Sequence, residues 1–572
     1  MRTTTWKLWA AAVLSAALLE LPFPLAGPMP SWRGVFAWFA LVPLMVAVLW
    51  PARAFPSTDR AAEKGSGKDA GRPRLVRRGF LLGYLCGVLW YGGNCYWIYD
   101  TMHVYGALPP LVSALLLLAF SLYLGLYFGL FGLSLALVRR ATGDTRLALL
   151  SAPLLWTAIE LATARITSFP WDQLGYSQVD NAMLSLLAPW TGVYGISFVL
   201  AAANALLAGV FLLNRRTHQR SFALTGVALM TAGTIGIFVP APHPNTTATA
   251  MLIQPNLDVA GANNWNGPEW DRHLAEFAYL ADQQCKSYIA GIPQTGAPTG
   301  QILCPPYATH PDLVAWPESP APFFELDARL PRSLATIAIN EKAPLVVGAV
   351  GVEYSSADQA YQDYNSALIF SSQGQQIGRY DKIHLVPFGE YIPFQNLLAF
   401  AHSLTGRISS MSAGEVRKIF RLDGHRYGIF ICYEAVFADE IRQFARLGGE
   451  VFVNVSDDGW YGDTSAAWQH LNMARMRAIE NRRWILRDTN NGVTAAIDPY
   501  GMVRQSIPRH QTDVLPASYG FVRDLTFYTE HGDLFAYACA ILATGLVGWS
   551  ARKWLRIYLA GSSKSKDRSS KS

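Results

Sequence analysis

The chain has few charged residues for its length. Lys, Arg, Asp and Glu make up 15% of its 572 residues, whereas hydrophobic residues make up 51% and aromatic residues 12%. In an ordinary soluble protein about a quarter of the residues are charged. The shortage of charge argues against a wholly soluble or disordered chain. The uneven hydropathy favours a membrane part joined to one soluble part.

Positive charge is also scarce in the soluble segment. The whole chain has a net charge of +6, but residues 241–533 hold 22 Lys or Arg against 31 Asp or Glu. A nucleic-acid-binding surface needs a basic patch, so no nucleic-acid partner is expected. The Cys and His spacings contain no zinc-binding pattern, and no metal is expected.

Long apolar runs fill the rest of the chain. Most approach or exceed the roughly 20 residues that a transmembrane helix needs. The runs cover residues 8–25, 35–50, 79–98, 111–138, 148–164, 187–213, 222–240 and 534–551. The sequence therefore predicts an α-helical membrane bundle with eight transmembrane helices.

The positions of Lys and Arg predict how these helices are oriented. With the N-terminus inside, the inner segments hold 23 Lys or Arg, and the short outer loops hold only Arg33 and Arg165. Loops rich in Lys and Arg stay in the cytoplasm. The predicted parts are a membrane domain with seven helices (1–240), an extracytoplasmic catalytic domain (241–533), the eighth helix (534–551) and a basic cytoplasmic tail (552–572).

Residues 249–515 have the pattern of an α/β domain, in which short β-rich runs alternate with amphipathic helices. The expected strands include 251–254, 313–316, 345–350, 366–370, 427–431 and 451–455. The expected helices are 268–284, 327–341, 435–447 and 465–483.

Three polar residues of this domain follow predicted strands: Glu318, Lys382 and Cys432. A strand-to-helix turn can expose a nucleophile while backbone amides face a developing oxyanion. A thiol needs a base to take its proton and a positive charge nearby, and Glu and Lys supply these. Each residue alone is more often structural, but together they predict a covalent active site.

Five motifs surround these residues, at 316–319, 380–393, 431–434, 454–463 and 489–493. Their order and spacing resemble the nitrilase, or carbon–nitrogen hydrolase, superfamily with its Glu-Lys-Cys triad. With the flanking apolar helices, the whole chain is similar to the apolipoprotein N-acyltransferase family of the bacterial inner membrane.

The resemblance implies a fold and a set of site residues. The fold would be an αββα sandwich, with Cys432 as nucleophile, Glu318 as general base and Lys382 as the cation that stabilises the oxyanion. The supporting residues that it implies are Glu390, Tyr433 and Glu434.

The resemblance also implies a reaction. An acyl chain would pass from a phospholipid, with phosphatidylethanolamine favoured, through a Cys432 thioester to the α-amino group of an S-diacylglyceryl cysteine on an apolipoprotein. No cofactor is expected. The chain would act as a monomer among membrane lipids, with its catalytic domain on the periplasmic side of the inner membrane.

Aromatic and loop segments are candidates for contacts with the lipid substrate. Trp265, Trp460 and Tyr461 are predicted lipid contacts, and residues 388–394 and 401–414 are candidates for a rim or lid. The alternative for all of them is ordinary loop packing.

Two histidines and two aspartates are interpreted as structural. His384 and His470 lie near motif residues, but a hydrogen-bonded structural histidine is commoner there than a catalytic one. Asp457 and Asp458, next to Gly459, are expected to cap or turn the chain.

Cys285 and Cys304 flank a segment rich in Gly, Pro, Thr and Gln. In an oxidising compartment two such cysteines are expected to form a disulfide. Cys86, Cys95 and Cys539 lie in or near the predicted membrane helices and are expected to stay free.

Two other functions fit parts of this sequence. A membrane-tethered amidase would share the triad and pass the acyl group to water. A transporter with an inactive nitrilase-like domain would need charged residues within its spans, and Glu20 and Glu160 are the only ones found in the predicted helices.

Overall fold

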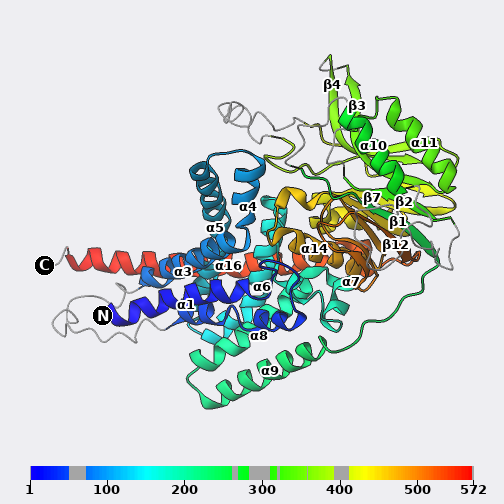
Figure 1. Cartoon of the computed structure of the whole chain (residues 1–572). Coiled ribbons are helices and arrows are strands. Elements are labelled where there is room, and N and C mark those ends of the chain that lie inside the picture. Colours follow the sequence, from blue (N-terminus) through cyan, green and yellow to red (C-terminus); the bar gives the residue numbers. More distant parts are fainter. Residues whose placement is uncertain are drawn as a thin grey trace. The chain divides into compact units, whose positions relative to one another are not determined.

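The computed structural model describes residues 2–50, 72–259, 268–281, 310–318, 323–356, 359–391 and 411–569. The chain forms two compact units (Figure 1). The helical unit comprises Met1–Tyr99, Pro110–Pro240 and His531–Ser572, and the α/β unit comprises Asp100–Pro109 and Ala241–Glu530. Trp265, Cys285, Cys304 and residues 392–394 and 401–410 of the candidate lid segments lie outside the described residues.

Helices occupy the apolar runs that the sequence predicts to cross a membrane. They are α1 (Arg2–Glu20), η1 (Ser31–Trp38), α2 (Val42–Leu49), α3 (Arg72–Asn94), α5 (Pro110–Thr142), α6 (Thr145–Ile166), α8 (Val193–Leu212), α9 (Arg216–Ile235) and α16 (Leu534–Ser569). Five segments of the described chain are long and apolar enough to cross a membrane: Ser31–Leu49, Pro110–Thr142, Thr145–Ile166, Val193–Leu212 and Leu534–Arg556.

Polar first turns set α3 and α9 apart from these five segments. The first seven residues of α3 include Arg72, Arg74, Arg77 and Arg78, so its apolar part begins only at Gly79. The first turns of α9 likewise contain several basic residues. Because basic side chains shorten the apolar length of a helix, the composition does not confirm the predicted count of eight crossings.

Glycines let α3 and α5 pack closely. A Cβ at Gly83 of α3 would overlap the carbonyl oxygen of Phe128 on α5, and a Cβ at Gly132 of α5 would overlap that of Gly79. Small residues at such crossings allow two backbones to approach in a membrane, where packing rather than hydrophobicity drives helix association. This pair therefore has the interface expected of membrane helices.

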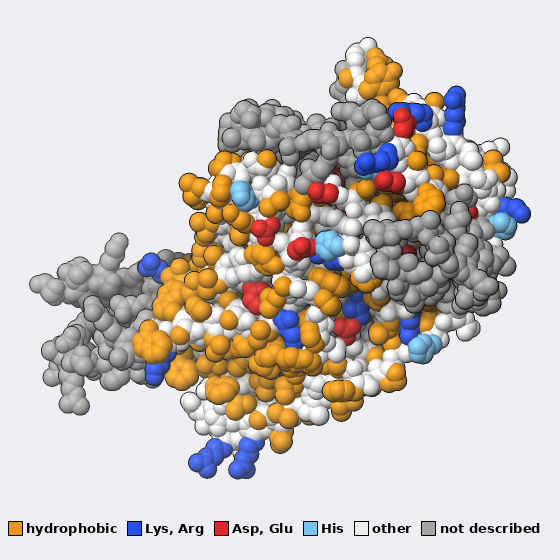
Figure 2. All heavy atoms as spheres, viewed as in Figure 1, with side chains coloured by type: hydrophobic (Ala, Val, Ile, Leu, Met, Phe, Trp, Pro, Cys, Tyr) orange, Lys and Arg blue, Asp and Glu red, His pale blue; other side chains and the backbone are white. Residues whose placement is uncertain are grey.

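One side of α5 exposes leucines at helical spacing. Leu111, Leu115, Leu118, Leu122, Leu126 and Leu130 are all exposed. Figure 2 shows hydrophobic side chains gathered over the surface of this unit. A large exposed apolar surface marks contact with a membrane or a partner, which agrees with the predicted membrane bundle.

The α/β unit contains two six-stranded sheets, ordered β12-β1-β2-β3-β4-β5 and β11-β10-β9-β8-β7-β6. The first is built from β1 (Ala248–Gln254), β2 (Leu313–Trp316), β3 (Leu345–Ser355), β4 (Ala360–Phe370), β5 (Gln376–Asp381) and β12 (Asp513–Tyr519). The second is built from β6 (Ile419–Leu422), β7 (His425–Ile431), β8 (Val451–Ser456), β9 (Ile485–Thr489), β10 (Thr494–Ile497) and β11 (Val503–Ile507).

Alternating residues of β1 show how the layers are held. Ala250 and Leu252 belong to the core that joins the two sheets, whereas Met251 and Ile253 belong to the core under α10 (Pro268–Ala281) and α11 (Arg329–Glu341). Successive side chains of a strand point to opposite faces, which places helices on one face and the second sheet on the other. The helices α13 (Ala438–Arg446) and α14 (Ala466–Asn481) pack against the second sheet. The unit has the expected αββα arrangement.

The central strands of both sheets are parallel. β1, β2 and β3 form one parallel set, and β7, β8 and β9 form the other. Functional groups of such sheets gather beyond the carboxyl ends of the strands. Glu318 follows β2, Cys432 follows β7 and Asp457 follows β8.

Candidate active site

The structure brings Glu318, Lys382 and Glu390 into direct contact. The Nζ atom of Lys382 lies 3.1 Å from Oε1 of Glu318 and 2.9 Å from Oε1 of Glu390. Lys382 immediately follows β5 and its side chain is 1% exposed. Burial lowers the pKa of the Lys382 ammonium, but the carboxylates of Glu318 and Glu390 outweigh burial and hold this pKa well above its ordinary value. The two carboxylates therefore favour the charged form of the lysine.

Asn365 of β4 links the two carboxylates, and no motif in the sequence indicates it. Its Nδ2 donates to Oε1 of Glu318 at 2.6 Å and to Oε1 of Glu390 at 2.5 Å. The backbone carbonyl oxygen of Asn365 accepts the backbone N–H of Lys382 at 2.8 Å. The Val386 N–H donates to the second oxygen of Glu390 at 2.7 Å. These bonds fix both carboxylates against the ammonium.

Cys432 occupies the turn between β7 and a short 3-10 helix, η8 (Cys432–Val436). Its φ is +47°, a left-handed conformation that a residue with a Cβ rarely adopts. Burial raises the pKa of the Cys432 thiol well above its ordinary value, the Glu318 charge raises it further, and Lys382 opposes both. The thiol is thus within electrostatic reach of both partners and needs a base before it can react.

Glu434 joins the strand end that carries Cys432 to the one that carries Lys382. Its Oε2 accepts the Ile431 N–H at 2.7 Å, and its Oε1 accepts the Ile383 N–H at 2.7 Å and the Tyr380 hydroxyl at 2.8 Å. Glu434 is fully buried, and burial raises its pKa although these bonds oppose the shift. Its contacts hold the backbone around the site.

The predicted aromatic lipid contacts differ in exposure. Trp460 is 41% exposed and its ring lies edge-on to Tyr105, with 6.1 Å between centroids. Tyr461 is buried, and burial and the charge of Cys432 raise its pKa. Tyr433 packs edge-on against Phe437 at 5.2 Å. Trp460 is thus exposed, whereas Tyr461 is buried, with its ring centroid 6.1 Å from that of His470.

Both aspartates lie in the turn that the sequence predicts, and Asp457 acts as its cap. Asp457 Oδ1 accepts the Gly459 N–H at 3.0 Å as a cap, and the Asp457 N–H donates to Glu318 Oε2 at 2.9 Å. Asp458 instead forms a fully buried ion pair with Arg487, at 2.8 Å. The adjacent Gly459 predicts the turn, but the local sequence does not predict the ion pair, because Arg487 lies 29 residues after Asp458, on β9.

His384 makes structural contacts. Its ring stacks on Phe437 at 4.3 Å, and its Nε2 lies 3.2 Å from Oε2 of Glu440. Neither contact involves the three triad residues, so the structural interpretation of His384 stands.

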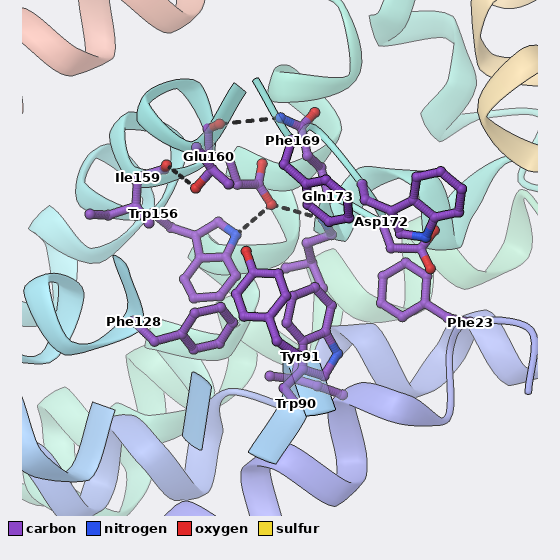
Figure 3. Close-up of a pocket in the computed structure, with 14 residues that line it drawn as sticks. Phe23, Trp90, Tyr91, Phe128, Trp156, Ile159, Glu160, Phe169, Asp172 and Gln173 are labelled. Carbon is purple, nitrogen blue, oxygen red and sulfur yellow. Dashed lines mark hydrogen bonds between the residues drawn. The ribbon is translucent and has the colours of Figure 1, made fainter. Parts of the chain in front are cut away.

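A separate cavity of about 30 Å³ lies within the helical unit (Figure 3). Its lining includes Trp90, Tyr91, Trp156 and Glu160, and none of the candidate site residues. Oε1 of Glu160 accepts the Trp156 Nε1–H and the Leu174 N–H, both at 2.8 Å. A space of this size holds about one or two waters, so it does not accommodate an acyl chain.

The free cysteines of the described chain are Cys86, Cys95, Cys432 and Cys539, all of them buried. The three in the helical unit are unpaired, as the sequence predicts. The Cys285–Cys304 disulfide stays a prediction.

Known proteins match both units of the chain. Residues 15–206 match the family model described as the apolipoprotein N-acyltransferase N-terminal domain, and residues 283–518 match that described as carbon-nitrogen hydrolase. The family predicted from the motifs is thereby confirmed.

Relatives named apolipoprotein N-acyltransferase align with most of the chain. The protein of Geobacter metallireducens is 34% identical over 548 residues, which cover 95% of this chain and 95% of the relative. That of Pseudomonas syringae pv. tomato is 32% identical over 482 residues, covering 83% and 88%. The chain therefore belongs to the apolipoprotein N-acyltransferase family.

Proposed function

We propose that this protein transfers an acyl chain from a phospholipid, through a thioester on Cys432, to the α-amino group of the N-terminal S-diacylglyceryl cysteine of apolipoproteins. The observation that carries the proposal is the buried Glu318–Lys382–Glu390 cluster within electrostatic reach of Cys432, in a chain of this family. The cluster supplies a base, a fixed cation and a nucleophile.

The first half-reaction forms the thioester. Glu318 takes the proton of the Cys432 thiol, and the thiolate attacks the ester carbonyl carbon of the phospholipid. Lys382 stabilises the oxyanion, aided by Glu390, which fixes the ammonium. When the tetrahedral intermediate collapses, the lysophospholipid alkoxide leaves and takes the proton back from Glu318.

The second half-reaction forms the amide. The neutral α-amino group of the acceptor attacks the thioester carbonyl, and Glu318 takes a proton from the attacking nitrogen. Collapse of the intermediate expels the Cys432 thiolate, which is reprotonated. The site thus returns to its starting state without a cofactor.

The surroundings proposed for this chemistry follow from the distribution of charge and apolar surface. In this proposal all eight apolar segments cross the bacterial inner membrane and the α/β unit faces the periplasm. The orientation is supported by the 23 Lys or Arg in the predicted inner segments against two in the short outer loops. Phosphatidylethanolamine is the proposed donor and a monomer the working unit. Exposed Trp460 is the proposed lipid contact of this unit, along with Trp265.

Mass spectrometry of the protein exposed to phospholipid tests the covalent step. We expect an acyl adduct on Cys432, and a diacylglyceryl peptide should then remove it as an amide. Cys432→Ser should fold and insert without forming the amide product. Release of the acyl chain only as free fatty acid would identify an amidase-like hydrolase instead, and normal turnover by Cys432→Ser would exclude a thioester.

Reporter fusions test the orientation. A reporter active only outside the cytoplasm should work when fused near residue 300 and fail when fused after residue 560. The opposite pattern would place the α/β unit in the cytoplasm, on the wrong side for periplasmic lipoproteins.

A further inference from the structure

A set of buried polar side chains behind Cys432 takes no part in the steps above. His470 lies on α14, Asp458 on the turn after β8 and Arg487 on β9, and all three are fully buried. His470 Nε2 lies 3.0 Å from the carbonyl oxygen of Cys432, and its Nδ1 lies 2.9 Å from Oδ1 of Asp458. His470 therefore connects Asp458 to the backbone carbonyl of Cys432.

Arg487 holds the far end of this set. Its Nη2 donates to both oxygens of Asp458, at 2.9 Å and 2.8 Å, and lies 3.1 Å from Nδ1 of His470. Its Nη1 donates to the side-chain oxygen of Asn454 on β8. Burial opposes the Asp458 charge, but Arg487 and His470 hold the pKa of this carboxyl below its ordinary value. Truncating one member of such a buried network leaves the charge of the other without its partner, so the contacts hold one another in place.

The contact with Cys432 fixes the direction of the donor. A carbonyl oxygen can only accept, so Nε2 of His470 carries the hydrogen. Burial and the Arg487 charge lower the pKa of His470, while the contacts with the Asp458 carboxylate and the Cys432 carbonyl oppose this shift. His470 therefore donates to the backbone carbonyl of the nucleophile through Nε2.

The backbone of Cys432 needs such support. Its φ of +47° is unfavourable for a residue with a Cβ, and such conformations persist where neighbouring groups hold them. The peptide unit is planar, so a bond to the Cys432 carbonyl oxygen fixes the whole plane between Cys432 and Tyr433. That plane sets the direction in which the Cys432 side chain leaves the backbone, and hence where its sulfur lies relative to Lys382.

We propose that His470 is a positioning residue for the nucleophile, and that Asp458 and Arg487 hold it in place so that its Nε2–H anchors the Cys432 carbonyl. This assignment rests on the proposed function in so far as Cys432 is the nucleophile. It assigns His470 no contact with substrate.

Two amide substitutions test the contacts of the two His470 ring nitrogens separately. In His470→Gln the side-chain nitrogen takes the place of Nε2 and can still donate to the Cys432 carbonyl. In His470→Asn it takes the place of Nδ1, and the carbonyl loses its donor. The matched control is His425→Asn, because His425 lies at the start of β7 and also contacts a buried carboxylate, that of Glu450, at 2.9 Å.

The measurements are kcat and KM for acyl transfer, and the rate at which iodoacetamide alkylates Cys432. Misplacing a reacting group by about 1 Å can cost roughly 10²-fold in rate. We therefore expect His470→Asn to lower kcat about 10²-fold with KM for the phospholipid nearly unchanged, and to slow alkylation about tenfold. His470→Gln should stay within about fivefold of wild type, and His425→Asn should match wild type.

Equal losses in His470→Gln and His470→Asn, or a kcat of His470→Asn within about fivefold of wild type, would overturn the assignment. If His470→Asn does not fold in detergent, Asp458→Asn is measured in its place. Asp458→Asn should lower kcat about tenfold at constant KM. Full activity of Asp458→Asn would also overturn the assignment. Alkylation needs no acyl donor. If wild type transferred no acyl group, the proposed function would fail while the alkylation rates still tested His470.

Discussion

Replacing Lys382 by Met should destabilise the α/β unit in a pH-dependent way. The ammonium lies within 3.1 Å of the Glu318 carboxylate and 2.9 Å of the Glu390 carboxylate, and it is almost fully buried. Methionine fills a similar volume without charge, so the two carboxylates, which Asn365 links, would face each other without the ammonium. Breaking a buried ion pair by removing one partner costs about 3–5 kcal/mol.

Protonation of one carboxyl group limits this cost. An ordinary glutamate has a pKa near 4.3, so protonating it at pH 7 costs about 3.7 kcal/mol, and at pH 5 about 1 kcal/mol. The folded variant then binds a proton that the unfolded chain does not, so its stability falls as pH rises above about 4. We expect Lys382→Met to lose about 3–4 kcal/mol at pH 7 and about 1 kcal/mol at pH 5.

Denaturant unfolding of the purified protein in detergent, at both pH values, measures this difference. The control is Lys418→Met, which changes an exposed lysine immediately before β6 and should change stability by less than about 0.5 kcal/mol at either pH. A loss by Lys382→Met of equal size at pH 5 and pH 7 would refute the reasoning, since it would indicate a packing defect rather than facing charges.

A second substitution separates stability from catalysis. Lys382→Met combined with Glu390→Gln removes one of the two facing carboxylates and should recover most of the stability lost at pH 7. Acyl transfer should stay reduced by at least about 10²–10³-fold, because the oxyanion still lacks its cation. Recovery of activity along with stability would show that Lys382 acts only as a counter-ion to the two glutamates.

Three further predictions concern other residues. Because burial raises the pKa of Cys432, its alkylation rate in the absence of lipid should keep rising with pH through about pH 9; a plateau below pH 8 would contradict the assigned environment. Burial, and then Glu318, raise the pKa of Asp457, so the folded state holds a proton that the unfolded chain releases above about pH 4. The stability of Asp457→Asn relative to wild type should therefore improve from pH 4 to pH 7, and a constant difference in unfolding free energy would argue against a protonated carboxyl. Non-reducing peptide mapping should find Cys285 and Cys304 in one linked species, while two separately alkylated thiols from protein isolated without reductant would exclude the bridge.

Glu318 and Cys432 were predictable because each follows a strand that ends in an apolar run, whereas Lys382 follows the largely polar β5 and is indicated mainly by its motif. Glu318, Lys382 and Cys432 come directly after or within two residues of β2, β5 and β7. A short apolar run bounded by turn residues is a local property of a sequence. The motif order then related the three strand ends to one family, without any knowledge of how the strands pair.

The number of membrane crossings was less well determined by local pattern. The apolar runs coincide with helices, but helices such as α3 and α9 begin in basic turns and leave short apolar stretches. Whether a helix of that kind crosses a membrane depends on its neighbours and on how its charged ends reach the interface, which composition alone does not supply.

The sequence by itself determined the helical and β-rich segments, the acidic character of the soluble part and the three reactive side chains, since all of these depend on residue type and short-range spacing. Only the tertiary structure decided which groups meet those side chains. Asn365 contacts Glu318 across 47 residues, and Arg487 reaches Asp458 across 29. Arg487 meets Asp458 because β9 lies beside β8, and Asn365 meets Glu318 because β4 and β2 lie in one sheet on either side of β3. Strand order is a property of the whole chain that no local pattern encodes.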